Sequence, residues 1–229
     1  ANDPMIKMQG GDPAACIPAG TAALASAILY QPVVYTPGTV WNYSTYDTYI
    51  VSAFFTSLTG NTLGDYATSE LFAPLGITSV APTDWSTFSL AYTYAGGTLL
   101  ITTRDIARIA LLVQYRGKWD GQQLISEQWI DDSLAAQGDG LKSTFDASGN
   151  PDVATAQNLR YGMQWWRSMS TSMTGPQSIT AIGLMGQMVH IFPEKGISII
   201  VTCDSDDAVT PRYDAINQFV QTHILDKAL

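Results

Sequence analysis

Helical and strand signals occupy different parts of this sequence, and their order restricts the fold more than any other feature. Four stretches with helical periodicity are expected at about 46–58, 62–72, 102–117 and 126–134. Short runs rich in β-branched or aromatic residues follow at 161–167, 186–193 and 197–203, and a last helix is expected at 212–224. Helices followed by an antiparallel meander and a closing helix predict an α+β fold, layered as α/β/α.

The ends of these elements carry residues that terminate helices and strands. Thr62 and Thr102 each stand three residues before an aspartate, a pattern typical of a capping box at a helix N-terminus. Gly60 and Gly117 follow helical stretches and are expected at the C-terminal ends. Pro193–Gly196 reads as a tight turn, so the last two strand runs should form a hairpin. The closing helix should carry Ile216, Phe219, Val220 and His223 on one face.

The length of 229 residues, 46% of them hydrophobic, is enough for one sizeable core in one or two domains. We interpret residues 1–229 as a single partial domain, in which 1–158 hold mainly helices and loops and 159–229 hold the strands and the closing helix. A short helix is expected at 21–30, and the Gly- and Pro-containing stretch 138–158 is expected to be an exposed loop.

The charge pattern and the cysteines exclude several classes of protein. The net charge is −9 and the eleven cationic residues are scattered, so nothing resembles a nucleic-acid footprint. No apolar stretch approaches the roughly 20 residues that span a bilayer, and no signal peptide is recognisable. Cys16 and Cys203 are too few for a disulfide framework; they could form one bridge, but small buried hydrophobic residues are the simpler interpretation.

Familiar catalytic and cofactor motifs are also missing from the sequence. It contains no G-x-S-x-G, C-x-x-C or H-E-x-x-H motif and no Gly-rich phosphate loop, so we predict no metal and no nucleotide cofactor. His190 and His223 are far apart, and His190 reads as a hydrogen-bonded histidine within a strand. A hydrolase with so few histidines needs another base, and Tyr or Lys can serve when a nearby cation lowers its pKa.

Four sequence blocks together resemble the serine β-lactamase and penicillin-binding-protein family. They are PGTVWNYSTYDTYIVSAFFTSLTGNTLGDYATSELFAPLG at 37–76, YAGGTLLITTRDIARIALLVQYRGKWDGQQLISEQW at 94–129, YGMQWW at 161–166 and GLMGQMVHIFPEKGISIIVT at 183–202. The segment Tyr43–Thr48 is most similar to the branch that holds family esterases and 6-aminohexanoate-dimer hydrolases. The resemblance implies a β-lactamase-like fold and acyl transfer through a serine ester.

The same resemblance assigns roles to particular residues. Tyr43 takes the place of the family tyrosine that moves protons, and Thr45 replaces the usual asparagine two positions on. The Lys-Thr-Gly strand motif falls on Leu184-Met185-Gly186, which makes the N–H of Gln187 the implied oxyanion donor. Leu184 and Met185 lack the cation and the hydroxyl that bind a β-lactam carboxylate, so the implied substrate is an uncharged ester or amide.

Ordinary structural interpretations of these residues stay open. Tyr43 could be a half-buried tyrosine like others in the chain, and Asp47 with Thr48 could cap a helix. Trp165 and Trp166 could line a cleft or belong to the core. Gly186 and Gln187 could form a β-bulge and nothing more.

No Ser-x-x-Lys motif occurs, because no lysine has a serine three residues before it. In the family this motif precedes the tyrosine block, so we expect this chain to be a fragment of a hydrolase whose serine and lysine lie elsewhere. The alternative is an inactive binding module of the same fold. A sheet without its first strands should dimerise, bind an N-terminal partner segment or be marginally stable. The resemblance also favours a periplasmic or secreted protein.

Overall fold

The structure is a computed structural model, in which the chain divides into two compact units. The N-terminal unit comprises residues 1–101 and 141–156, and the C-terminal unit comprises 102–140 and 157–229. The residues described are 30, 32–33, 35–41, 44–81, 84–85, 87–89, 92–93, 95–135, 142–143, 160–167, 178–183, 186–203 and 211–227. The helix expected at 21–30 and the loop expected at 138–158 lie outside them, apart from residues 30 and 142–143.

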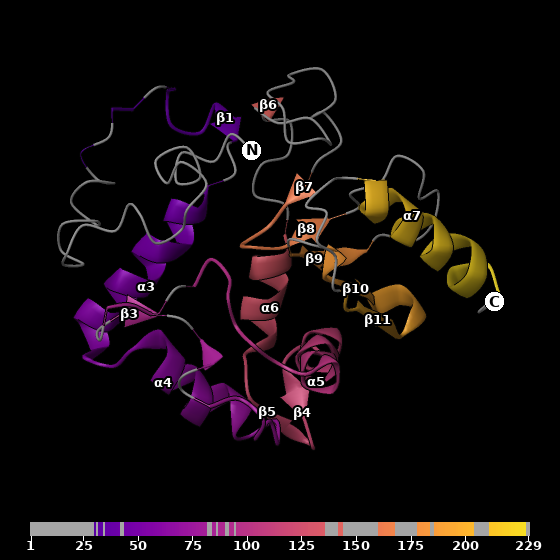
Figure 1. Ribbon diagram of the computed structural model, residues 1–229, viewed down its shortest axis with the longest axis horizontal. Coiled ribbons are helices and arrows are strands. Elements are labelled where there is room, and N and C mark those ends of the chain that lie inside the picture. The colour runs from indigo at the N-terminus through magenta and orange to yellow at the C-terminus, as the bar shows by residue number, and fades with distance from the viewer. Residues whose placement is uncertain are drawn as a thin grey trace. The chain divides into compact units, whose positions relative to one another are not determined.

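Two of the expected helices form the framework of the N-terminal unit, drawn in indigo and violet in Figure 1. Helix α3 spans Thr45–Thr59 and ends at Gly60, whose φ is +72°. Helix α4 spans Leu63–Ala67, and the hydroxyl of Thr62 accepts a hydrogen bond from the N–H of Asp65 at 3.0 Å. The helix continues as a π-helical segment, Thr68–Phe72 (η1), so both expected helices and their caps are confirmed.

Short strands complete this unit. Strand β1 (Val40–Trp41) pairs in parallel with β6 (Lys142–Ser143), and β2 (Thr87–Ser89) pairs antiparallel with β3 (Tyr92–Thr93).

Buried polar contacts hold α3, β3 and α4 together. The fully buried hydroxyl of Ser52 donates a hydrogen bond to the carbonyl of Thr93 at 2.7 Å. The hydroxyl of Thr93 in turn accepts from the N–H of Gly64 at 2.8 Å. These two hydrogen bonds join the three elements at one point and give the hydroxyls of Ser52 and Thr93 a partner.

An antiparallel sheet of five strands forms the centre of the C-terminal unit, in the order β11-β10-β9-β8-β7. Its strands are β7 (Arg160–Tyr161), β8 (Trp166–Arg167), β9 (Ile179–Ile182), β10 (Met188–Phe192) and β11 (Ile197–Val201). The hairpin expected from the turn at 193–196 is confirmed, and Gly196 has a φ of +64°.

Two strand predictions need correction. The run at 161–167 was expected to be one strand, but the chain reverses within it to form the hairpin of β7 and β8, and Gln164 in that turn has a φ of +70°. Strand β10 begins at Met188, so Gly186 and Gln187 lie in the connection after β9 instead of in a strand. Strand β9 itself was not predicted.

Helices cover both faces of this sheet. Ala110 and Val113 of α5 (Thr103–Gln114) pack against Ile179 and Ile191 on one face. On the other face, Phe192 packs with Val220 and Leu225 of η6, the π-helical segment Val220–Leu225 that continues α7 (Pro211–Phe219). Neighbouring residues of a strand point to opposite faces, and Ile191 and Phe192 accordingly contact different helices.

The closing helix does not present the face that its sequence indicated. Val220 and Leu225 are buried, whereas Phe219 is 58% exposed and contacts His223, with 4.9 Å between the ring centroids. The helix changes to π-helical hydrogen bonding at Val220, and this change shifts the residues that face the sheet away from the α-helical period.

A hairpin and a short helix follow α5. Strands β4 (Lys118–Trp119) and β5 (Gln122–Gln123) are joined by Asp120 and Gly121, whose φ angles of +46° and +77° are typical of a type I′ turn. Helix α6 (Glu127–Leu134) begins after Ser126, whose hydroxyl accepts the N–H of Trp129 at 3.2 Å, as its sequence predicted.

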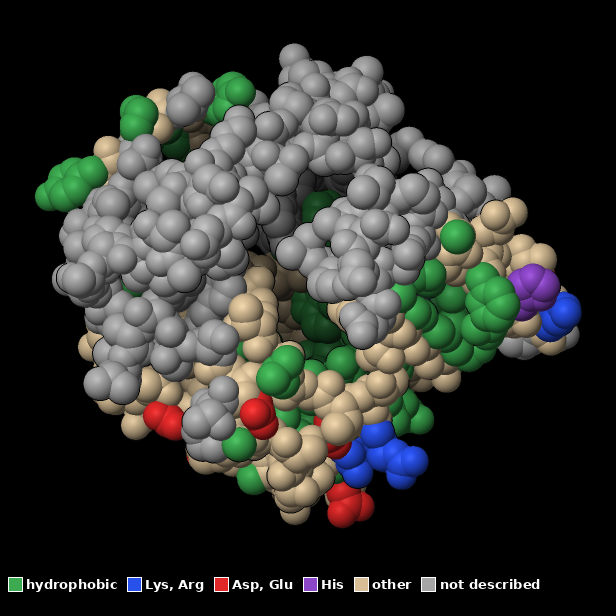
Figure 2. Space-filling view, viewed as in Figure 1, with side chains coloured by type: hydrophobic (Ala, Val, Ile, Leu, Met, Phe, Trp, Pro, Cys, Tyr) green, Lys and Arg blue, Asp and Glu red, His purple; other side chains and the backbone are tan. Residues whose placement is uncertain are grey.

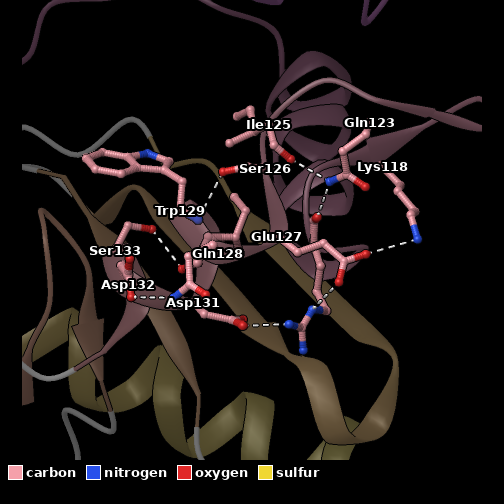
Figure 3. A network of polar contacts seen from close by, with 12 residues as sticks. Lys118, Gln123, Ile125, Ser126, Glu127, Gln128, Trp129, Asp131, Asp132 and Ser133 are labelled. Carbon is pink, nitrogen blue, oxygen red and sulfur yellow. Dashed lines mark hydrogen bonds and ion pairs between the residues drawn. The ribbon is translucent and has the colours of Figure 1, made fainter.

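Ion pairs connect this hairpin with α6, as Figure 3 shows. Lys118 lies 3.0 Å from Glu127, and Arg116 lies 2.5 Å from Asp131. The hydrogen bond and charge of Lys118 lower the pKa of the exposed Glu127 carboxyl. Exposed pairs of this kind contribute little to stability.

Candidate active site

The structure describes only part of the site that the sequence predicted. Tyr43, Leu184 and Met185 lie outside the described residues. Thr45 is the first residue of α3, and its side chain is also outside them. Gly186 and Gln187 are described and lie between β9 and β10 in the C-terminal unit, whereas Tyr43 and Thr45 belong to the N-terminal unit.

Gly186 occupies a position that a larger residue would strain. Its φ of +90° is in the region that favours glycine, and the residue is buried. A Cβ atom there would lie 3.2 Å from the Cβ of Cys203 and 3.7 Å from the Cδ1 of Ile216 in α7. The glycine therefore lets the turn after β9 approach the chain that follows β11.

Gln187 fastens this turn to the end of β11. Its side-chain carbonyl accepts the backbone N–H of Cys203 at 3.1 Å, and its side-chain NH₂ donates to the backbone carbonyl of the same residue. The backbone carbonyl of Gln187 accepts from the N–H of Gly183 at 2.8 Å. One amide side chain thus continues the pairing of β10 with β11 beyond the last backbone pair, Met188 with Val201.

Three polar groups of Gln187 are engaged in these contacts, namely its side-chain carbonyl, its side-chain NH₂ and its backbone carbonyl. A donor whose backbone is held on both sides needs little rearrangement when negative charge develops next to it.

A chain of buried polar side chains crosses the neighbouring strands. His190 of β10 is 2% exposed, and its Nδ1 lies 3.3 Å from the hydroxyl of Thr180 in β9. That hydroxyl lies 3.4 Å from the hydroxyl of Ser178. The side chain of His190 also stacks on Phe192, with 6.2 Å between the centroids. The expectation of a hydrogen-bonded strand histidine is confirmed.

Burial makes His190 a neutral residue at physiological pH. Removal from water lowers the pKa of His190 to about 4, because the charged imidazolium loses its hydration. Its Nε2 has no hydrogen-bond partner among the described residues. A histidine this hard to protonate is a poor general base, and it acts as a structural residue of the sheet.

The aromatic pair and the described cysteine lie in the C-terminal unit and are partly buried. Trp165 packs against the cluster formed by α5 and the sheet, and Trp166 meets Tyr161 edge to face at 4.6 Å. Cys203 is half-buried, and Cys16 lies outside the described residues. In the described part of the chain, no group of three or more His, Cys, Asp or Glu residues could hold a metal ion. No helix of that part is long and apolar enough to cross a membrane.

The chain is a mixed α/β protein, with a helical part followed by an antiparallel sheet that helices cover on both faces. In its C-terminal unit, the turn at Gly186 and Gln187 is held against Cys203 beside the central strands. A family model described as Beta-lactamase matches residues 4–222, which is nearly the whole chain. The chain belongs to the beta-lactamase family, as the four sequence blocks indicated. Among curated proteins, none matches the chain closely enough to count as a relative.

Solved structures of the same fold are longer than this chain. A protein described as a 6-aminohexanoate-dimer hydrolase from Bacillus anthracis matches with a TM-score of 0.67 and 16% identity, over 97% of this chain and 54% of its own. An octameric penicillin-binding-protein homologue from Pyrococcus abyssi matches with 0.66 and 16%, over 94% and 50%. A beta-lactamase from Mycobacterium bovis matches with 0.60 and 19%, over 82% and 66%. The chain thus spans about half to two thirds of the structures it resembles.

Proposed function

We propose that this chain is part of a serine hydrolase that cleaves an uncharged ester or amide through an acyl-serine intermediate. The chain contributes Tyr43 as the proton-transferring residue and the N–H of Gln187 as an oxyanion donor. The match of the beta-lactamase family model to residues 4–222 is the observation that carries this proposal. The mutual position of Tyr43 and Gln187 is part of the proposal, since the two belong to different units.

The conformation of the turn at Gly186 supports the role of Gln187. An oxyanion donor must keep its direction while charge builds up on the substrate, and the side chain of Gln187 holds its own backbone against Cys203. The glycine before it lets this turn lie against the chain after β11, since a Cβ at position 186 would lie 3.2 Å from the Cβ of Cys203.

The residues next to Gly186 limit the substrate. Leu184 and Met185 offer neither charge nor a hydroxyl group, so a carboxylate on the substrate would lose its hydration without a partner. Thr45, in place of an amide side chain, keeps one hydrogen bond of the kind an asparagine would form. We therefore expect an ester or amide without a negative charge beside the scissile bond.

The nucleophile of this reaction lies outside residues 1–229, because no Ser-x-x-Lys motif is present in them. The test uses a fluorophosphonate, which modifies activated serine hydroxyls covalently. This chain by itself should remain unmodified, while a longer product of the same reading frame should be modified at the serine of an upstream Ser-x-x-Lys motif. Modification of this chain alone would show that the nucleophile lies within it.

An inactive binding module is the second candidate, and the missing motif is the observation that favours it. The two candidates differ in the reading frame, because a start codon next to Ala1 would leave the chain without any Ser-x-x-Lys motif. Such a module would bind an ester or amide, or cell-wall material, without releasing product.

Tyr43 can be tested in a longer product that hydrolyses p-nitrophenyl esters. Tyr43→Phe should lower kcat by roughly 10²–10⁴, the usual contribution of a general base. Unchanged turnover would remove Tyr43 from the mechanism.

Export to the periplasm or the exterior also belongs to this proposal, and fractionation of the native host would check it.

A further inference from the structure

The turn at Gly186 lies next to the closing helix as well as next to the chain after β11. A Cβ built on Gly186 would lie 3.2 Å from the Cβ of Cys203 and 3.7 Å from the Cδ1 of Ile216, a residue of α7. The second distance is that of an ordinary van der Waals contact between carbon atoms. A methyl group of the helix therefore lines the space beside the Cα of Gly186.

Glycine makes this turn possible and also makes it easy to distort. Gly186 has a φ of +90°, a conformation that glycine adopts without strain, but glycine populates other conformations as readily. The residue is buried. Neighbouring side chains must therefore supply the restraint that a side chain at position 186 would otherwise give.

The hydrogen bonds of Gln187 fix its position but not the direction of its backbone N–H. They join its side chain to the backbone of Cys203 and its backbone carbonyl to the N–H of Gly183. The N–H belongs to the planar peptide unit that Gln187 shares with Gly186. A rotation of that one peptide unit would redirect the N–H while the hydrogen bonds stay in place.

Ile216 is itself held by the apolar cluster between the sheet and the closing helix. It is partly buried and packs against the cluster of Phe192, Val220 and Leu225. Figure 1 draws α7 beside β10 and β11, and Figure 2 shows hydrophobic side chains gathered over the same elements. A β-branched side chain in a helix also has one strongly preferred χ1 rotamer. The side chain next to Gly186 is therefore stiff.

We propose that Ile216 is a positioning residue of the candidate active site. Its Cδ1 methyl group packs beside Gly186 and keeps the peptide unit between Gly186 and Gln187 in one orientation. The N–H of Gln187 is then already directed at the oxygen on which negative charge develops. In this role Ile216 acts through the turn and touches no reacting atom. The inference rests on the proposed function, in which Gln187 is an oxyanion donor.

The first experiment measures the mobility of the Gln187 N–H in this chain by NMR relaxation. Its order parameter should be about 0.85 in the wild type and below about 0.6 in Ile216→Ala. Hydrogen exchange at the N–H of Cys203 should not change, because the side chain of Gln187 still holds that residue. This pair of results separates a reoriented peptide unit from an unfolded turn.

Ile224→Ala is the matched control. It makes the same change on the same closing helix, at a partly buried residue that packs against the same cluster but lies roughly two turns further on. Its order parameter at Gln187 should equal that of the wild type. Ile216→Val, which removes the Cδ1 methyl group alone, serves if Ile216→Ala does not fold.

The second experiment measures ester hydrolysis by a longer product that contains the Ser-x-x-Lys motif. Ile216→Ala should lower kcat by about tenfold, a part of the roughly 10²–10³ that loss of an oxyanion donor costs. KM should stay within about twofold, because the N–H of Gln187 acts mainly in the transition state. Ile216→Leu, which keeps a terminal methyl group, should restore most of kcat, and Ile224→Ala should leave kcat unchanged.

A wild-type order parameter at Gln187 in Ile216→Ala would overturn the inference, as would an equal drop in Ile224→Ala. A longer product that hydrolyses esters with unchanged kcat after Ile216→Ala would also overturn it, while the proposed function would stand. A wild-type product that hydrolyses no ester would overturn the proposed function. The order parameter would then still show whether Ile216 orients the N–H of Gln187.

Discussion

Replacement of Gln187 tests whether its side chain holds the turn of the candidate active site. Gln187→Ala removes both hydrogen bonds to the backbone of Cys203. Each such bond is worth about 0.5–1.5 kcal/mol net, so the variant should lose about 1–3 kcal/mol of unfolding free energy. Urea unfolding followed by tryptophan fluorescence measures this loss, since Trp165 and Trp166 lie in the same unit.

Gln187→Glu gives the same test a pH dependence. A carboxylate still accepts the N–H of Cys203, but its second oxygen faces the carbonyl of that residue and repels it. A protonated carboxyl can donate there, so folding raises the pKa of the introduced group above its ordinary value near 4.3. The stability of this variant relative to wild type is therefore highest below about pH 4 and falls as pH rises through the folded-state pKa.

The control for this series is Gln122→Glu, which introduces the same charge on an exposed side chain of β5. It should change stability by less than about 0.5 kcal/mol at any pH. The contribution of His190 is common to all variants and cancels in the differences. A constant gap between Gln187→Glu and wild type from pH 7 to pH 4 would refute the reasoning, as would a neutral Gln187→Ala.

Three further predictions concern the fold. Gly117→Ala should lower the free energy of unfolding, measured in urea, by about 2–5 kcal/mol, because its Cβ would lie 2.0 Å from the carbonyl oxygen of Ile125. Gly121→Ala is the control, since Gly121 has a similar φ with open space around it, and it should cost only about 1–2 kcal/mol. Stability should fall by about 3 kcal/mol from pH 6.5 to pH 4, because the unfolded chain takes up a proton on His190 before the folded chain does; His190→Gln should flatten this part of the profile. Ser52→Ala should cost about 1–3 kcal/mol by leaving the buried carbonyl of Thr93 unpaired, and an unchanged urea midpoint would contradict that role.

The helices were predictable because their signals are local. The threonines at positions 62 and 102 cap their helices through the aspartates three residues later, and the apolar spacing around Ala110 matches the face that packs on the sheet. The hairpin of β4 and β5 was not among the predictions, although Asp120-Gly121 is an equally local and strong hairpin signal.

The sheet and the site were less predictable because they depend on partners distant in sequence. Strand β9 is identified by its pairing with β10 and β8, and its four residues alone are too short for a periodicity signal. Ser178 and Thr180 alternate with apolar residues, and this alternation was the one local signal for a strand with a polar face. The side chain of Gln187 acts on Cys203, sixteen residues away, and no local pattern in either segment indicates that contact.

A short piece of backbone connects strand β11 with the candidate site. Strand β11 ends at Val201, two residues before Cys203, and Cys203 is the residue that Gln187 holds. The N–H of Cys203 is protected from exchange by this contact, so Gln187→Ala should speed amide hydrogen exchange at Cys203. Unchanged exchange at Cys203 in that variant would show that the side chain of Gln187 does not hold the chain after β11.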